Sequence, residues 1–237
     1  MNDPKNDPAA ELLRKWAEGD ARAGDRLLRL NLDALHRFFI NKVAERDVAD
    51  LIQETMVQCT RSRGTFEGGS KVRTWLLGIA NNVLLHHYRW RGRKGDKLDP
   101  GTDSTFDVVD TSRMSSLLAR RREQELVVDA LRRIPIEQQV ILELTYWEGL
   151  TGEECGVVLG LGLPNVRGRL RRAKASLKAA LQAGSGSSVE KESVSEKLGE
   201  WIMGIHQRLG DDSQERLRKI GEWRENEVEV AGTDENR

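Results

Sequence analysis

The segment from Thr151 to Leu181 constrains the fold more than any other part of the chain. Thr151 is a favourable N-cap residue, and Gly160 supplies the left-handed residue that ends many helices. Leu161 then stands as an apolar plug, and Pro164 falls where the first turn of a second helix tolerates proline. The segment therefore predicts two helices joined by a tight turn, the arrangement called a helix-turn-helix.

The second of these helices has an apolar face and a strongly basic remainder. Helical spacing turns Val166, Leu170, Ala173 and Leu177 inward. The basic residues left largely outward are Arg167, Arg169, Arg171, Arg172, Lys174 and Lys178, with no acid among them. Arginine binds guanine edges bidentately and phosphates by charge, so this helix suits a DNA major groove. A solvated basic face is the alternative interpretation.

Helical periodicity also fills the rest of two longer stretches, residues 11–93 and 117–182. Residues 94–116 are rich in Gly, Pro, Ser and Thr and predict a flexible linker. Interruptions at Ile134-Pro135, at Gly149 and at Gly160 divide the second stretch into four helices. We therefore expect an all-α protein with two small helical domains, followed by an extension over residues 183–237.

The first domain contains one sharply patterned helix, for which Asp47 is the predicted N-cap. Its apolar face consists of Val48, Leu51, Ile52, Thr55, Met56 and Cys59. Polar side chains, among them Asp50, Gln53 and Glu54, occupy the other sides. After a glycine-containing loop, a long helix is expected from about Lys71 to Trp90, with a basic C-terminal end.

Composition excludes several classes of protein. The formal net charge of zero is an average over acidic and basic segments, so it does not argue against nucleic acid. The two cysteines lie far apart on apolar stripes, so no disulfide framework is expected. Adjacent His86 and His87 point to different helix faces, so no metal site is expected. We expect a cytoplasmic protein that is not inserted in a membrane, because no signal peptide or long apolar run occurs. Without a phosphate-binding motif or a nucleophile-base pair, neither an enzyme nor a cofactor is expected.

Taken together, the two domains resemble the extracytoplasmic-function sigma factors of bacterial RNA polymerase. Residues 47–55 and 72–76 resemble domain two of that family, and four segments resemble its domain four: residues 131–135, 138–142, 146–151 and 160–174. The resemblance covers about residues 11–181. It implies a factor that binds core RNA polymerase and promoter DNA and directs promoter-specific initiation, with an anti-sigma factor as a further candidate partner.

The resemblance also implies which residues act. Polymerase-clamp contacts would come from Asp47, Asp50, Gln53 and Glu54. Domain two would melt and read the minus-ten element, holding a flipped base near Asn82, through Lys71, Arg73, Asn82, Arg89, Trp90 and Arg91. Domain four would read the minus-thirty-five element through Asn165, Arg167, Arg169, Arg171, Arg172 and Lys174. His86, Asn81 and Gly152 depart from the residues usual in the family, which affects the promoter contacts rather than the assignment.

Two questions stay open at this point. A helix-turn-helix regulator that never joins polymerase would show a similar charge pattern, and run-off transcription with core polymerase separates the two functions. The extension carries an apolar helical stripe, including Trp201, Ile202 and Ile205, within a mostly acidic segment. It is expected either to regulate the factor, by covering basic surfaces in cis or by anchoring on polymerase, or to be a passenger tail.

Overall fold

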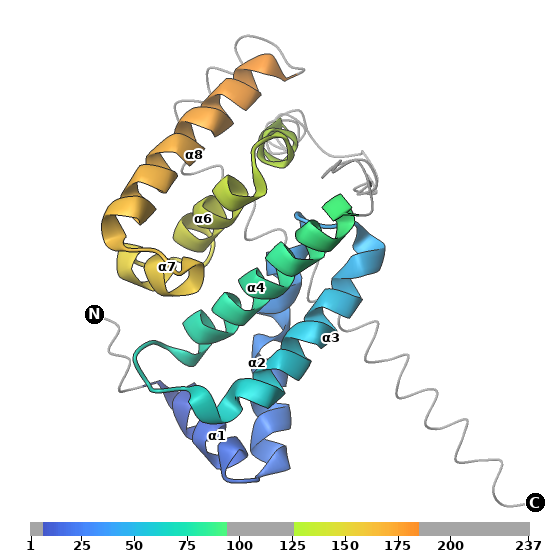
Figure 1. The fold of residues 1–237 in the computed structure, drawn as a ribbon, viewed down its shortest axis with the longest axis vertical. Coiled ribbons are helices and arrows are strands. Elements are labelled where there is room, and N and C mark those ends of the chain that lie inside the picture. The colour runs from blue at the N-terminus through green and yellow to red at the C-terminus, as the bar shows by residue number, and fades with distance from the viewer. Residues whose placement is uncertain (1–6, 94–125, 185–237) are drawn as a thin grey trace, which may run out of the picture.

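The computed structural model describes residues 7–93 and 126–184, and every element in this part is a helix. The first domain contains α1 (Pro8–Ala17), α2 (Ala21–Ile40), α3 (Glu45–Ser62), the short 3-10 turn η2 (Arg63–Thr65) and α4 (Val72–Arg93) (Figure 1). The all-α prediction is confirmed. The predicted linker and nearly all of the predicted extension lie outside the described residues.

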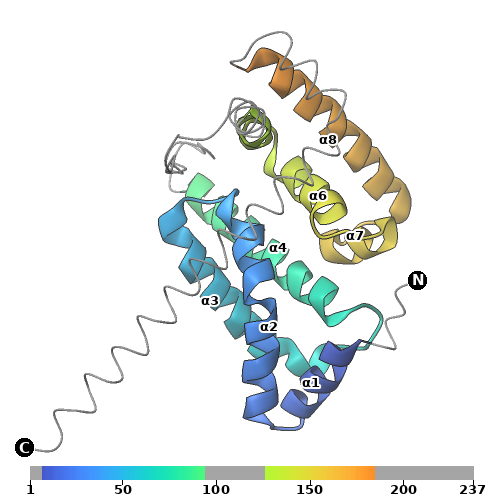
Figure 2. The same cartoon turned by 180° about the vertical axis from the view of Figure 1, so that it is seen from behind.

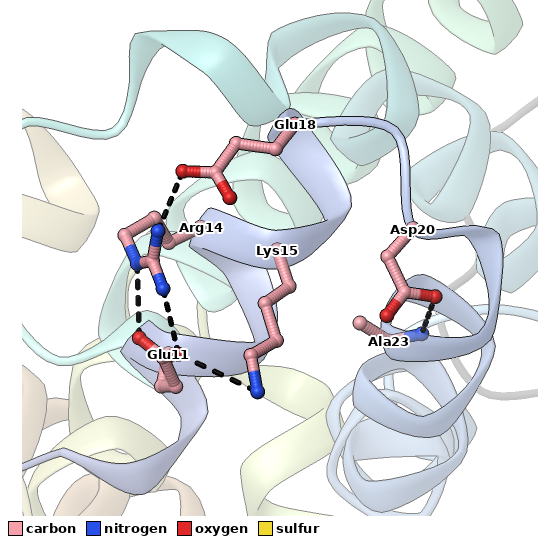
Figure 3. A network of polar contacts seen from close by, with 6 residues as sticks. All are labelled: Glu11, Arg14, Lys15, Glu18, Asp20 and Ala23. Atoms are coloured by element: carbon pink, nitrogen blue, oxygen red, sulfur yellow. Dashed lines mark hydrogen bonds and ion pairs between the residues drawn. The ribbon is translucent and has the colours of Figure 1, made fainter.

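Side-chain caps fix where the first two helices begin. Asp7 accepts a hydrogen bond from Ala9 N at 3.0 Å and, through its other carboxylate oxygen, from Val72 N at 2.8 Å. One residue thus caps α1 and ties it to the start of α4. Asp20 caps α2 by accepting from Arg22 N and Ala23 N, beside the exposed ion pairs that Arg14 makes with Glu11 and Glu18 (Figure 3). Exposed pairs of this kind contribute little to stability, so the caps matter more.

The core of the first domain follows the predicted stripes closely. The buried side chains of α3 are Val48, Leu51, Ile52, Thr55 and Cys59, with Met56 half-buried. They face α2 and α4, which supply Leu27, Leu35, Phe39, Leu76, Leu77 and Leu84. Close packing extends to α1, where the Trp16 indole lies against Gly24 so tightly that a Cβ there would be 2.4 Å from Trp16 Nε1.

The predicted N-cap of α3 is wrong by three residues, nearly one helical turn. The helix begins at Glu45 after Ala44, which makes no side-chain cap, and Asp47 lies within the first turn. An acid is favourable in the first turn as well as at the cap, because both positions lie at the positive end of the helix dipole. The sequence signal is therefore the same for both, and the exact start was not determined by it.

The second domain breaks where the sequence indicates. Residues 126–133 are helical, and they are followed by α6 (Ile136–Tyr146), α7 (Gly152–Leu159) and α8 (Leu163–Ala183).

 Gly149 and Gly160 both adopt positive φ, 63° and 64°, as helix-ending glycines do. The break at Ile134 is closed by Gln139, whose Nε2 donates to Ile134 O at 3.0 Å. These predicted breaks are confirmed.

The two domains pack against each other along α4. This helix lies between α2 and α3 on one side and α7 on the other, as both views show (Figure 1 and Figure 2). Gly78 of α4 lies close to the backbone of α7, since a Cβ built there would lie 3.8 Å from Val158 Cα. No sequence pattern predicted this contact between domains.

Candidate nucleic-acid interface

The turn between α7 and α8 is built from the residues that the sequence singles out. Thr151 Oγ1 accepts from Glu154 N at 3.2 Å, and Glu154 Oε2 accepts from Thr151 N at 2.8 Å, so the two residues form a reciprocal capping box. At the other end, Leu161 N donates to Gly156 O at 2.9 Å. Pro164 lies in the first turn of α8, as predicted. Hydrogen bonds therefore fix both ends of α7.

Gly156 allows this turn to close. It is buried, and a Cβ built on it would lie 2.6 Å from Leu161 O, closer than real Cβ atoms approach a carbonyl oxygen. The glycine therefore has a packing role in the close approach of the turn to α7, which offsets its unfavourable helix propensity.

The basic face of α8 is mostly exposed to solvent. Val166, Ala173, Leu177 and Leu181 are buried on the opposite side. Exposed residues on the outer side are Asn165, Arg167, Arg171, Arg172 and Lys174. Because α8 contains no acid, these cations are not neutralised by neighbours on their own helix. The surface is suited to a polyanion.

Arg169 differs from the other predicted residues of α8. Its guanidinium lies 3.5 Å from a carboxylate oxygen of Glu137 in α6, and its side chain is only 25% exposed. Lys174 also has a neighbour on α6, since its Nζ lies 5.3 Å from the centroid of the Tyr146 ring. Arg169 is therefore the member of the set most engaged within its own domain.

The polar face of α3 is exposed at three of its four predicted positions. Asp50, Gln53 and Glu54 are solvent-exposed. Asp47 instead turns toward α4, where its carboxylate lies 3.4 Å from Arg91 Nη1 and 3.8 Å from His87 Nε2. Burial lowers the pKa of His87, and the nearby Asp47 carboxylate opposes that shift. Asp47 thus contributes to the α3–α4 contact more than to the exposed face.

The predicted residues of α4 divide into an exposed group and an engaged group. Asn82 and Arg89 are exposed, Trp90 is 45% exposed, and Lys71 at the helix start is half-buried. Arg91 is paired with Asp47, as described above. Arg73 forms an ion pair with Glu148 of the second domain. The structure therefore does not bring all six side chains to one open surface.

Tyr88, which alternates with arginines in the sequence, faces the interior. Its hydroxyl donates to the backbone carbonyl of Lys42, and burial raises its pKa to about 12. Trp90, two residues further along α4, is instead 45% exposed.

Sequence reasoning missed a buried ion pair between the domains. Lys42, after the end of α2, pairs with Glu143 of α6, and their side chains are 0% and 3% exposed. Burial lowers the pKa of Lys42 and raises that of Glu143 to about 7, in each case against the effect of the partner charge. Glu143 lies within the apolar run from Val140 to Leu144. A charge inside such a run signals a buried partner, but nothing in the sequence says which residue it is.

Within residues 7–93 and 126–184, His, Cys, Asp and Glu side chains form no cluster of three or more suited to a metal ion. No helix of this part of the chain combines the length and the apolar character needed to cross a bilayer. Cys59 and Cys155 are both buried free thiols, on the apolar stripes where the sequence placed them.

Two protein families match the two domains. The model described as Sigma-70 region 2 matches residues 27–94, and that described as Sigma-70, region 4 matches residues 124–177. The RNA polymerase sigma factor NccH of Alcaligenes xylosoxydans xylosoxydans is 30% identical over 188 residues, covering 77% of this chain and 98% of that protein.

A second curated relative and a solved structure agree with these matches. The ECF RNA polymerase sigma factor SigM of Mycobacterium tuberculosis (strain ATCC 35801 / TMC 107 / Erdman) is 30% identical over 170 residues, 71% of this chain and 82% of that protein. The structure of CnrH in complex with the cytosolic domain of CnrY is 26% identical, with a TM-score of 0.54, and the match covers 76% of this chain and 100% of that one.

Proposed function

The chain belongs to the extracytoplasmic-function sigma factors of the sigma-70 family, and from that premise we propose how its surfaces divide promoter recognition. It is an RNA polymerase sigma factor that binds core polymerase and promoter DNA and directs promoter-specific transcription initiation. The family is not enzymatic.

Domain four reads the minus-thirty-five element through α8. The supporting observation is its exposed, acid-free surface, formed by Asn165, Arg167, Arg171, Arg172 and Lys174. Each good base-specific pair contributes about 1–3 kcal/mol of discrimination, whereas phosphate contacts set register and salt dependence. Arg169 acts more through its contact with Glu137, which helps orient α8 on α6.

Domain two melts and reads the minus-ten element through the exposed part of α4 and the loop before it. Asn82 presents an amide that both donates and accepts, which suits an extruded base, and flipping a base costs a few kcal/mol. Trp90 offers a stacking surface beside the cation of Arg89. Arg73 and Arg91 join this surface only when their side chains turn away from Glu148 and Asp47. Lys71 joins it from the start of α4, where it is half-buried.

Core polymerase binds the exposed face of α3. Asp50, Gln53 and Glu54 present carboxylates and an amide there, and complementary charge sets orientation and association rate. Asp47 contributes indirectly, because its carboxylate pairs with Arg91 of α4 and so helps to hold α3 in place. Because bacterial polymerase works in the cytoplasm, we place the protein there. A protein inhibitor, an anti-sigma factor, is the further partner we propose, since CnrH was solved with the cytosolic domain of CnrY.

Run-off transcription with purified core polymerase tests the proposed function. We expect promoter-specific transcripts, whereas a helix-turn-helix regulator that does not join polymerase would give none. Arg171→Glu should weaken binding to a minus-thirty-five duplex roughly tenfold or more, because an attractive contact becomes repulsive. Lys178→Glu makes the same charge change farther along α8 and should cost much less. Equal losses in the two variants would refute the assignment of Arg171.

A further inference from the structure

Four cations of α8 form a single row on its exposed side. Arg167, Arg171, Lys174 and Lys178 follow one another at spacings of four, three and four residues, and all four are exposed. Residues three and four apart lie on the same face of a helix, with about 5–6 Å between their Cβ atoms. We call these four residues the cationic row.

Nothing within α8 balances the charge of this row. The helix contains six basic residues and no acid. Like charges three and four residues apart destabilise a helix, so an anion that neutralises the row is favourable. Promoter phosphates are one such anion. A carboxylate-rich segment of the same chain is another, provided that it can reach the row.

The sequence that follows α8 is rich in carboxylates. Residues 184–237 contain thirteen acidic and eight basic side chains, a formal charge of −5, so residues 1–183 carry +5 in a chain whose total is zero. Four of the acids come early, namely Glu190, Glu192, Glu196 and Glu200. Between α8 and these acids lies the sequence Gly-Ser-Gly-Ser-Ser, whose composition is typical of flexible linkers. The early acids are thus tethered to the helix that carries the cationic row.

The length of this tether matches the position of the row. Lys178 and Arg167 lie six and seventeen residues before Gly184, or roughly 9–26 Å back along the helix. Glu190 to Glu200 lie six to sixteen residues after Gly184, and flexible chains of that length span roughly 12–24 Å. Effective concentration is highest when the length of the tether matches the span, and it reaches millimolar values for short flexible tethers. The early acids are therefore placed to reach the row.

A later group of acids provides an internal comparison. Glu222, Glu225 and Glu229 lie 38 to 45 residues after Gly184, for which the same relation gives roughly 31–40 Å. That span exceeds the distance to the farthest cation of the row, and effective concentration falls as a tether grows beyond the length that is needed. The position of the early acids, rather than the total charge of the segment, should therefore decide how well they compete.

We propose that residues 190–200 cover the cationic row of α8 in cis, as an anionic competitor of promoter phosphates. This cover rests on the proposed reading of the minus-thirty-five element by α8, to which it adds self-inhibition. In the free factor the four early acids occupy the row, and a DNA duplex must displace them. Because only the uncovered fraction binds DNA, the apparent dissociation constant of a minus-thirty-five duplex is raised by the inverse of that fraction.

Two charge-matched variants of the full chain test the cover. The early variant, Glu192→Gln/Glu196→Gln/Glu200→Gln, removes three carboxylates that reach the row. The late variant, Glu222→Gln/Glu225→Gln/Glu229→Gln, removes the same number beyond it. Binding to a minus-thirty-five duplex is measured by fluorescence anisotropy at low salt. The early variant should bind about threefold to tenfold more tightly than wild type, and the late variant should gain less than about twofold.

The salt dependence of the same measurement supplies a second test. Exposed charges are screened as salt is added, because the Debye length falls from about 30 Å at 0.01 M to about 8 Å at 0.15 M and about 3 Å at 1 M. The advantage of the early variant should therefore disappear at high salt, while DNA binding by every variant weakens through counterion release. An advantage that does not change with salt would overturn an electrostatic cover.

Failure of the cover and failure of the proposed function give different results. If wild-type protein directs no initiation with core polymerase, or if Arg171→Glu leaves duplex binding unchanged in the background of the early variant, the proposed function is wrong. If both of those controls behave as expected and the early variant binds no better than wild type, the row is not covered. If the early and late variants gain equally, only net charge matters, and the inference is overturned.

Discussion

Substituting Gly156 by alanine tests whether the turn of the helix-turn-helix depends on close backbone approach. The new Cβ would lie 2.6 Å from Leu161 O, and Gly156 O also accepts the hydrogen bond from Leu161 N at 2.9 Å. Relieving the clash by moving Leu161 would lengthen that bond. The obstacle is backbone rather than a flexible side chain, so the turn itself must shift.

The expected magnitude follows from two opposing effects. Alanine is favoured over glycine in a helix by about 1 kcal/mol, whereas overpacking a close contact costs about 1–3 kcal/mol and sometimes more. Because backbone cannot yield as a side chain can, we expect Gly156→Ala to lower the free energy of unfolding by about 1–2 kcal/mol. Binding to a minus-thirty-five duplex should weaken as well.

Gly168→Ala is the matched control in α8. There the nearest atom to a new Cβ is Arg172 Nη1 at 3.7 Å, the far end of a flexible side chain. The same substitution should therefore stabilise the protein by up to about 1 kcal/mol through helix propensity alone. Urea unfolding of the full chain, followed by circular dichroism, compares the two variants. If Gly156→Ala is as stable as wild type, or if both variants lose stability equally, the reasoning is refuted.

Two further predictions concern the first domain. Gly24→Ala should destabilise the protein by about 1–3 kcal/mol in urea unfolding, because its Cβ would lie 2.4 Å from Trp16 Nε1, and unchanged stability would contradict the packing of α1 on α2. The pKa of His87 is lowered by burial, so its stabilising effect is present above the unfolded value of about 6.5 and is lost as pH falls through the folded pKa. The free energy of unfolding should thus decrease from pH 7 to pH 5 more in wild type than in His87→Gln, and equal slopes would refute this.

Local sequence signals were enough to predict the helices and the turn of the second domain. Thr151, Gly160 and Pro164 act through the backbone within a few residues of themselves, so their roles can be read without knowing what else is nearby. The apolar stripes of α3 and α8 are equally local, because a regular helix repeats its faces. The acid at Asp47 shows the limit of such signals, since it indicated a helix start without fixing the first residue.

Which charged side chains are exposed depends on how the helices pack in three dimensions. Lys42 and Glu143 lie 101 positions apart in the chain, and no periodicity links residues at that distance. Arg73 and Arg91 carry the same charge as Arg89, yet the partner of Arg73 lies just after α6 and that of Arg91 lies in α3, so exposure depends on how the helices assemble. Local propensity specifies elements, whereas burial and pairing are properties of the packed chain, and the state of each charge follows from its neighbours in space.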